Sequence, residues 1–320
     1  MSITTEAFRG VRKSSRWPVV RASTRPRNAL VERRLDQAST AARPSTATRL
    51  LAACGVFLTA LGLVIAVFFA YLFGLSAIQS ARGQHQLLAE FSGPAGLAAI
   101  SGRAPGEGQP AAVLTIPALH LQQVVVEGTS AADLQSGPGL MPGTAAPGTF
   151  GDAVIAGRRT TFGGAFAAIS SLRPGSVVSI TTARGIYHYI VTGVVAMPNS
   201  APLPVGQHAS AQLFLVTSRS SFPPSGWLVV RAKLHGHPLP SAEVSSGIPT
   251  QSELHLSGDV SAALPSLLWG EALAALIVVA VVAYRRSRQP LVTYLLTMPI
   301  LFVVALLCFQ NIARLLPATM

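Results

Sequence analysis

Three long apolar runs dominate the hydropathy pattern of the chain. Residues 50–78 and 291–312 contain no charged side chain, and residues 264–284 contain only one acid, Glu271. About 20 apolar residues are needed to cross a bilayer as a helix, and the core of a secretory signal is shorter, roughly 7–15 residues. Pro299 is compatible with a membrane helix, since neighbours can satisfy the freed backbone groups. We predict three transmembrane helices.

Between the first two runs, apolar residues occur in short β-branched segments separated by Gly and Pro. The candidate strands are residues 113–117, 122–127, 153–156, 176–182, 186–197, 213–218 and 227–234. Residues 130–135 are typical of a short helix with Thr129 or Ser130 as its cap and Gly137 as its stop. Several short strands between turn signals indicate a closed or nearly closed β-barrel. The predicted fold class is therefore mainly β, with three transmembrane α-helices.

These patterns divide the chain into consecutive segments. We expect a basic, disordered cytoplasmic tail (1–49), transmembrane helix 1 (50–78), a stalk (79–110), the β-barrel (111–235), a tether (236–263), transmembrane helix 2 (264–284), a cytoplasmic loop (285–290), transmembrane helix 3 (291–312) and an extracytoplasmic C-terminus (313–320).

The net charge of +12 is concentrated beside the apolar runs. Most of the excess lies in residues 1–49, a second cluster comprises Arg285, Arg286 and Arg288, and residues 83–263 are nearly neutral. Because basic residues near span ends stay cytoplasmic, both clusters predict a plasma-membrane protein with a cytoplasmic N-terminus and an extracytoplasmic barrel. We expect anionic lipid as the partner of the tail, and no nucleic acid. Nucleic-acid binding or a phosphorylation-controlled partner is the alternative role for the tail.

The two cysteines, Cys54 and Cys308, both lie inside apolar runs. Neither is placed to form a disulfide in the barrel or to act there as a nucleophile, and both are expected to pack as small apolar residues. Glu271 stands near the end of its run, where its carboxylate is expected to reach the outer headgroup layer. No spacing of His, Asp or Glu predicts a metal site, and we expect no cofactor.

The order of motifs in the barrel region resembles the sortase family, most closely its actinobacterial class E type. The resemblance covers roughly residues 113–234. The residues that carry it are Leu114–Pro117 with Val124–Thr129, Gly137–Thr144 with Ala153–Gly163, and Phe214–Ser218 with Trp227–Ala232.

The resemblance implies a β-barrel with a Cys–His–Arg transpeptidase site. Such a site cleaves a sorting signal near the C-terminus of a secreted protein and joins that protein to the cell wall or to a pilin. In this sequence the position that matches the family's histidine holds Arg158, the cysteine position holds Ser218, and the arginine position holds Trp227.

These three replacements are incompatible with the family's chemistry. Serine, unlike cysteine, needs an adjacent general base to attack a carbonyl. The guanidinium of Arg158 has no lone pair to offer as that base, and the indole of Trp227 is only a neutral donor for an oxyanion. We therefore expect no catalytic residues, and we predict a pseudoenzyme.

A binding groove is the remaining expectation for this region. If the fold is kept, Arg158, Arg159, Thr217, Ser218, Arg219 and Trp227 converge on a cationic, aromatic-edged groove. Such a groove suits an extended peptide or an anionic envelope polymer, and a vestigial groove without a ligand is the alternative.

Three functions follow as hypotheses. The first is a noncatalytic protein that binds or scaffolds cell-envelope proteins or polymers at the outer membrane face. The second is a serine-dependent transpeptidase or hydrolase in which His208 activates Ser218; His188 is the other candidate base, although its strand favours a surface position. The third is recruitment of another membrane protein by the C-terminal helical hairpin, through Glu271 or small-residue helix faces.

Overall fold

The computed structural model describes residues 46–93, 105–198, 201, 210–221, 224–239, 250–288 and 290–320. Contacts between residues divide the chain into two units, residues 1–61 and residues 62–320. The second unit holds the barrel and the C-terminal helices. Most of the predicted tail, and the candidate base His208, lie outside the described residues.

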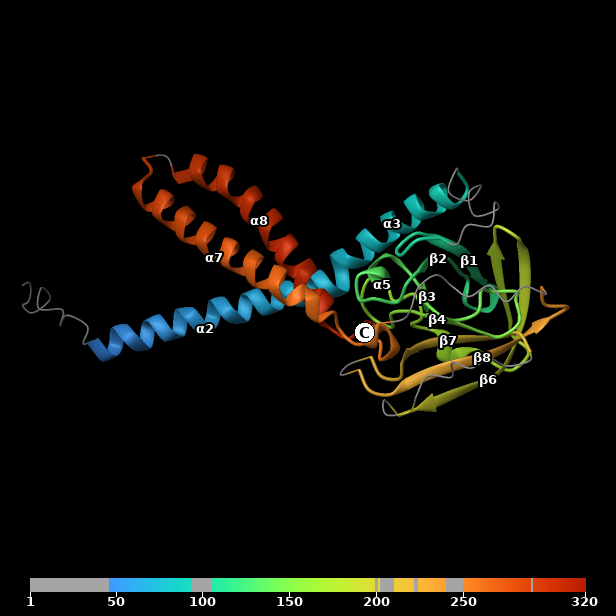
Figure 1. Ribbon diagram of the computed structural model, residues 1–320. Helices are drawn as coiled ribbons and strands as arrows, with labels where there is room; N and C mark the ends of the chain where they lie inside the picture. The colour runs from blue at the N-terminus through green and yellow to red at the C-terminus, as the bar shows by residue number, and fades with distance from the viewer. Residues whose placement is uncertain are drawn as a thin grey trace, which may run out of the picture. The chain divides into compact units, whose positions relative to one another are not determined.

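The described residues form a closed barrel in which the strands follow the order β1-β2-β3-β4-β7-β8-β6-β5 (Figure 1). Neighbouring strands are antiparallel except for the β2–β3 and β4–β7 pairs, which are parallel. This confirms the predicted fold class. The strands are β1 Pro110–Ile116, β2 Leu121–Glu127, β3 Gly139–Leu140, β4 Asp152–Ala156, β5 Val177–Thr182, β6 Gly185–Met197, β7 Gln212–Ser218 and β8 Trp227–His235.

Strands β4 and β7 and the first half of β8, Trp227–Val230, are buried on both faces. Since side chains alternate along a strand, Leu213 and Leu215 join the barrel interior, whereas Phe214 and Val216 join a second apolar cluster on the outer face. This explains why β7 is an almost continuous apolar run rather than an alternating one. The outer cluster needs a cover, and Leu256 and Ala318 provide part of it.

The remaining elements are helical. The first helix is continuous through α2 Thr46–Ala70, the π-helical turn η1 Tyr71–Leu75 and α3 Ser76–Phe91. The C-terminal hairpin consists of α7 Ala263–Arg286 and α8 Pro290–Leu315, which pack along each other (Figure 1). Short elements are η2 Pro117–Leu119, α5 Asp133–Ser136, η3 Ile169–Ser171, α6 Gln251–Leu254 and η4 Val260–Ala262.

Among the described residues, three helices are long and apolar enough to cross a membrane: Gly62–Phe91, Val260–Arg286 and Leu295–Leu315. Three is also the number of transmembrane helices predicted from the apolar runs of the sequence. The first one extends beyond residue 78, because polar residues that we predicted to form a stalk continue the helix as α3.

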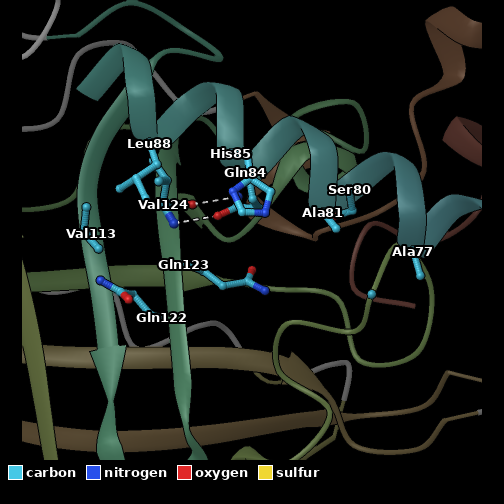
Figure 2. Close-up of a pocket in the computed structure, with 11 residues that line it drawn as sticks. Ala77, Ser80, Ala81, Gln84, His85, Leu88, Val113, Gln122, Gln123 and Val124 are labelled. Carbon is cyan, nitrogen blue, oxygen red and sulfur yellow. Dashed lines mark hydrogen bonds between the residues drawn. The ribbon is translucent and has the colours of Figure 1, made fainter. Parts of the chain in front are cut away.

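Helix α3 is packed against the barrel instead of acting as a free spacer. The Gln84 side chain donates to the Val124 carbonyl (3.1 Å) and accepts from the Val124 amide (2.7 Å) (Figure 2). It also donates to the Ser136 carbonyl (2.7 Å). The amide of Gln84 thus pairs with β2 as a neighbouring strand would. Gly137 leaves room for it, because a Cβ at that position would collide with the Gln84 amide.

Replacing Gln84 by Leu should loosen this edge of the barrel. The substitution leaves one amide and two carbonyls without their partner, at a cost of about 1–3 kcal/mol. We expect hydrogen exchange of the Val124 amide to become at least tenfold faster. Gln86→Leu, an exposed position on the same helix, is the matched control; equal exchange in both variants would contradict this role of Gln84.

The predicted tether and the end of the chain also contact the barrel. Glu253 of α6 accepts from the Thr129 amide at 3.3 Å, and Leu256 packs in the outer cluster. Residues 317–320, which we call the strap, form a turn in which the Met320 amide donates to the Pro317 carbonyl at 3.1 Å. Ala318, Thr319 and Met320 are all buried. The strap is therefore part of the cover over β4, β7 and β8.

Candidate functional site

The candidate site lies at the end of β7, where Ser218 pairs with Trp227, the first residue of β8. Alternation along these strands places Ser218 on the face of Phe214 and Val216, and Trp227 on the face of Val229. Two of the predicted site residues therefore share the covered outer face of the barrel.

A pocket of about 250 Å³ opens beside this pair of residues. Its walls come from the end of β7, the β7–β8 turn, the segment after α6 and the strap. The lining residues are Ser218, Pro224, Ser225, Gly226, Trp227, His255, Leu256, Ser257, Pro317 and Thr319. Residues near 255 and 317 are not predicted to reach this place, because only the fold of the outer face brings them there.

Ser218 is buried and its hydroxyl is engaged by the backbone. Its Oγ donates to the carbonyl of Ser220 at 2.9 Å, so its proton is directed at a carbonyl rather than at a general base. His188, one candidate base, instead bonds Ser179 through Nδ1 at 2.8 Å. His255, which sequence reasoning overlooked, is exposed and lines the same pocket as Ser218.

Arg158 is 2% exposed and serves as an internal cross-link. Its Nε donates to the Leu134 carbonyl (3.0 Å), Nη2 to the Ala131 carbonyl (2.8 Å) and Nη1 to Thr161 Oγ1 (3.1 Å). The guanidinium also lies 4.8 Å from the centre of the Phe162 ring. Burial lowers the pKa of the Arg158 guanidinium to about 9, because the charged form loses its hydration.

The expected groove is therefore assembled differently from the prediction. Arg158 points into the protein, and the arginine that reaches β7 is Arg159, whose Nη1 donates to the Ser218 carbonyl at 3.3 Å. Thr217 is fully buried and donates to the Gly157 carbonyl at 2.8 Å, and Arg219 is exposed in the β7–β8 turn. Three of the six predicted residues thus lie together. Arg159 bonds the Ser218 carbonyl, and Ser218 and Trp227 line the same pocket.

The Trp227 side chain is packed inside the protein rather than exposed to solvent. It is 7% exposed and belongs to the outer cluster together with Leu256 and Ala318. It forms one wall of the pocket. An indole in this position supplies apolar surface and no charge, whereas the Arg159 guanidinium bonds the Ser218 carbonyl.

A group of three acids lies on the side of the barrel near α5. Carboxylate oxygens of Glu107, Asp133 and Glu253 lie within 4.8 Å of one another. Sequence reasoning did not foresee this group, because its members are far apart in the chain. Asp133 accepts from the Ser130 amide (3.1 Å) and hydroxyl (2.6 Å), and Glu253 accepts from the Thr250 amide (2.8 Å). These bonds explain Asp133 and Glu253 as caps of their own loops.

Asp133 makes the stability of the fold depend on pH. Burial raises the pKa of its carboxyl, the nearby acids Glu107 and Glu253 add to this rise, and the Ser130 hydrogen bonds oppose it. The folded chain therefore holds the proton more tightly than the unfolded chain. It loses stability as pH rises from the ordinary Asp pKa of about 3.9 through the raised value.

We accordingly expect Asp133→Asn to raise the unfolding temperature at pH 7 and to leave it almost unchanged near pH 3.5. The amide can still accept from Ser130 but carries no charge. Thermal unfolding of the full chain in detergent with a chelator checks this. A lower unfolding temperature at pH 7 would show that the carboxylate is stabilising.

A second hollow of about 390 Å³ lies between α3 and the β1–β2 pair (Figure 2). Ala77, Ser80, Ala81, Gln84, His85 and Leu88 line it from the helix, with Val113, Gln122, Gln123, Val124 and Gly163 opposite. It is separate from the Ser218 pocket, and the two share no lining residue.

The architecture defines a closed β-barrel domain combined with membrane-length apolar helices. A family profile of the sortase domain matches residues 114–235, which span β1 to β8. The protein thus carries a sortase domain, and the resemblance seen in the sequence is confirmed. A search of curated proteins found no match.

Solved structures similar to the chain are sortases as well. A sortase D5 transpeptidase of Clostridium perfringens is 23% identical, with coverage of 49% of this chain and 98% of that one and a TM-score of 0.44. Sortase E of Streptomyces avermitilis is 28% identical, with coverages of 43% and 98% and a TM-score of 0.37. The SrtF sortase of Corynebacterium diphtheriae is 19% identical, with coverages of 47% and 94% and a TM-score of 0.39.

Proposed function

We propose that the protein is a membrane-anchored, noncatalytic sortase-like protein that binds or scaffolds proteins or polymers of the cell envelope. The observation that carries this proposal is the use made of the three positions that match the family's catalytic residues. Ser218 donates to a backbone carbonyl, Arg158 is an internal cross-link, and Trp227 is a packing residue. None of these environments prepares a nucleophile, a base or an oxyanion donor.

The binding part of the proposal rests on Arg159 and the pocket. The Nε atom of Arg159 and the Oγ1 atom of Thr160 are buried and have no hydrogen-bond partner within the described part of the chain. A buried donor without a partner is costly, and a ligand that supplies an acceptor removes that cost. A peptide carbonyl or an anionic polymer group next to the apolar wall of Trp227 fits this combination.

The test uses the full chain in nanodiscs and a pool of peptides taken from the C-terminal regions of secreted cell-wall proteins. We expect peptides to bind without being cleaved, as read by mass spectrometry. Arg159→Gln should weaken binding at least fivefold, whereas Arg219→Gln, at an exposed position in the β7–β8 turn, should not. Cleavage that disappears in Ser218→Ala would overturn the proposal.

His255 supports a second candidate, a serine-dependent hydrolase or transpeptidase, because it shares the pocket with Ser218. This alternative requires the Ser218 hydroxyl to turn from the Ser220 carbonyl toward the imidazole. It predicts labelling of Ser218 by a serine-directed acylating probe, and loss of the label in His255→Ala. An unlabelled Ser218 in the intact chain would exclude it.

We also propose the orientation with residues 1–49 and the loop 285–290 in the cytoplasm and the barrel outside. The basic residues Arg285, Arg286 and Arg288 at the end of α7 support it, since such residues stay cytoplasmic. In a chain without Cys54 and Cys308, an impermeant thiol reagent should label Arg184→Cys in intact cells. It should label Arg288→Cys only after permeabilisation, and the reverse pattern would invert the orientation.

A further inference from the structure

The strap binds the barrel through its main chain next to the place where the Arg159 side chain reaches the Ser218 carbonyl. The Arg159 amide donates to the Thr319 carbonyl at 3.0 Å, and the Thr161 amide donates to the Met320 carbonyl at 3.3 Å. The Thr161 hydroxyl also donates to the Met320 carbonyl, at 2.7 Å. On the other side, the Ala318 amide donates to the Leu256 carbonyl at 3.1 Å.

These contacts are those of a bound peptide. Four hydrogen bonds recognise main-chain groups of the strap, which every peptide offers. Ala318 is the strap residue that packs in the apolar outer cluster. The strap closes one side of the pocket beside Ser218 and Trp227, since Pro317 and Thr319 belong to its wall. A peptide that enters this pocket therefore meets the strap.

The closed arrangement leaves polar groups at the same place unsatisfied. Arg159 Nε and Thr160 Oγ1 belong to the Arg159–Thr161 segment that holds the strap, and neither atom has a hydrogen-bond partner in the described chain. The strap thus uses the main chain of this segment and the Thr161 hydroxyl, but not the side-chain groups of Arg159 and Thr160 that lack a partner. A ligand that offers acceptors to those side chains can compete with the strap for the same segment.

We propose that residues 317–320 are an autoinhibitory segment, an internal peptide that holds the binding face closed until a peptide ligand replaces it. The strap directly follows α8, so a movement of the end of α8 moves the strap. Phe309 and Ala313 of α8 pack with Phe162 of the loop that grips the strap. The membrane hairpin and the binding face are thereby joined. This proposal rests on the peptide-binding function proposed above.

The first experiment compares the full chain with a variant that lacks residues 317–320, both in nanodiscs. The probe is a fluorescent peptide with the sequence of residues 312–320. We expect it to bind the shortened variant at least tenfold more tightly than the full chain. The same peptide with Ala318→Glu is the control, and it should bind at least tenfold more weakly because position 318 is fully buried.

Equal affinity for both proteins, or equal affinity of both peptides, would overturn the proposal. A second measurement on the intact chain covers the case in which the shortened variant does not fold. Hydrogen exchange of the Arg159 and Ala318 amides should be at least tenfold faster than that of the Gly157 amide, which donates to Val216 inside the barrel at 3.0 Å. Exchange at the rate of Gly157 would mean that the strap opens only when the barrel unfolds.

The two proposals fail in different ways. If the shortened variant binds the 312–320 peptide but no cell-wall peptide, the strap closes the binding face as proposed, and the proposed binding of cell-envelope proteins is wrong. If cell-wall peptides bind the full and shortened proteins equally, the function stands and the strap is not inhibitory.

Discussion

Replacing Arg158 by Met is expected to lower the free energy of unfolding by about 2–4 kcal/mol. Two effects oppose each other in this variant. Removal of a guanidinium whose pKa is lowered by burial relieves the cost of keeping a charge away from water. The carbonyls of Ala131 and Leu134 and the hydroxyl of Thr161, however, remain buried and lose their donor.

The unpaired acceptors decide the outcome, because each costs about 1–3 kcal/mol. For a domain of this size the loss corresponds to a fall of about 5–15 °C in the unfolding temperature. Thermal unfolding of the full chain in detergent measures it. The matched control is Arg159→Met, since Arg159 is partly exposed and its side chain makes one hydrogen bond, of 3.3 Å, within the described chain. The effect of this control should stay below about 1 kcal/mol.

An unchanged unfolding temperature in Arg158→Met would mean that the relief of the buried charge balances the lost hydrogen bonds. Arg158 would then be free to vary without structural consequence. The explanation of position 158 as a structural cross-link would be wrong, and a role in ligand binding would have to be sought for it again.

The barrel could be predicted from the sequence because its signals are local. β-branched segments, Gly and Pro turns and the Ser130–Asp133 cap mark each element within a few residues, and the observed strands begin and end close to the predicted ones. The apolar runs of the helices are local as well. Each of these elements is recognisable without knowing what it contacts.

The candidate site could be predicted only in part, because its cover is nonlocal. Residues 158 and 218 are related by a family pattern, but which side chain turns inward depends on α5 and the turn before it, where the carbonyls of Leu134 and Ala131 accept from Arg158. Leu256 and Ala318 reach the outer face from the segments that we predicted to be a tether and an extracytoplasmic C-terminus. Nothing in their own composition indicates that they cover β7 and β8.

Restoring the three residues of the family's site should abolish the fold rather than create an enzyme. Arg158→His removes at least two of the three hydrogen bonds of the internal cross-link, because an imidazole has fewer donors and a shorter reach. Trp227→Arg introduces a charge into the cluster of Leu256 and Ala318. Each change is expected to cost about 2–4 kcal/mol, and together they remove a large share of the 5–15 kcal/mol that stabilises a typical domain.

Ser218→Cys is the control for this experiment, since it changes one atom at a position whose hydroxyl makes a single bond to the backbone. We expect it to fold with nearly unchanged stability and to cleave no sorting-signal peptide, because no base is directed at position 218. The triple variant should be unstable and equally inactive. Cleavage by the triple variant would show that the barrel still holds a working site and that three substitutions alone separate it from an enzyme. An unfolded triple variant that cleaves no peptide would show that Arg158 and Trp227 have become part of the packing. The barrel would then depend for its stability on the residues that replace the catalytic ones.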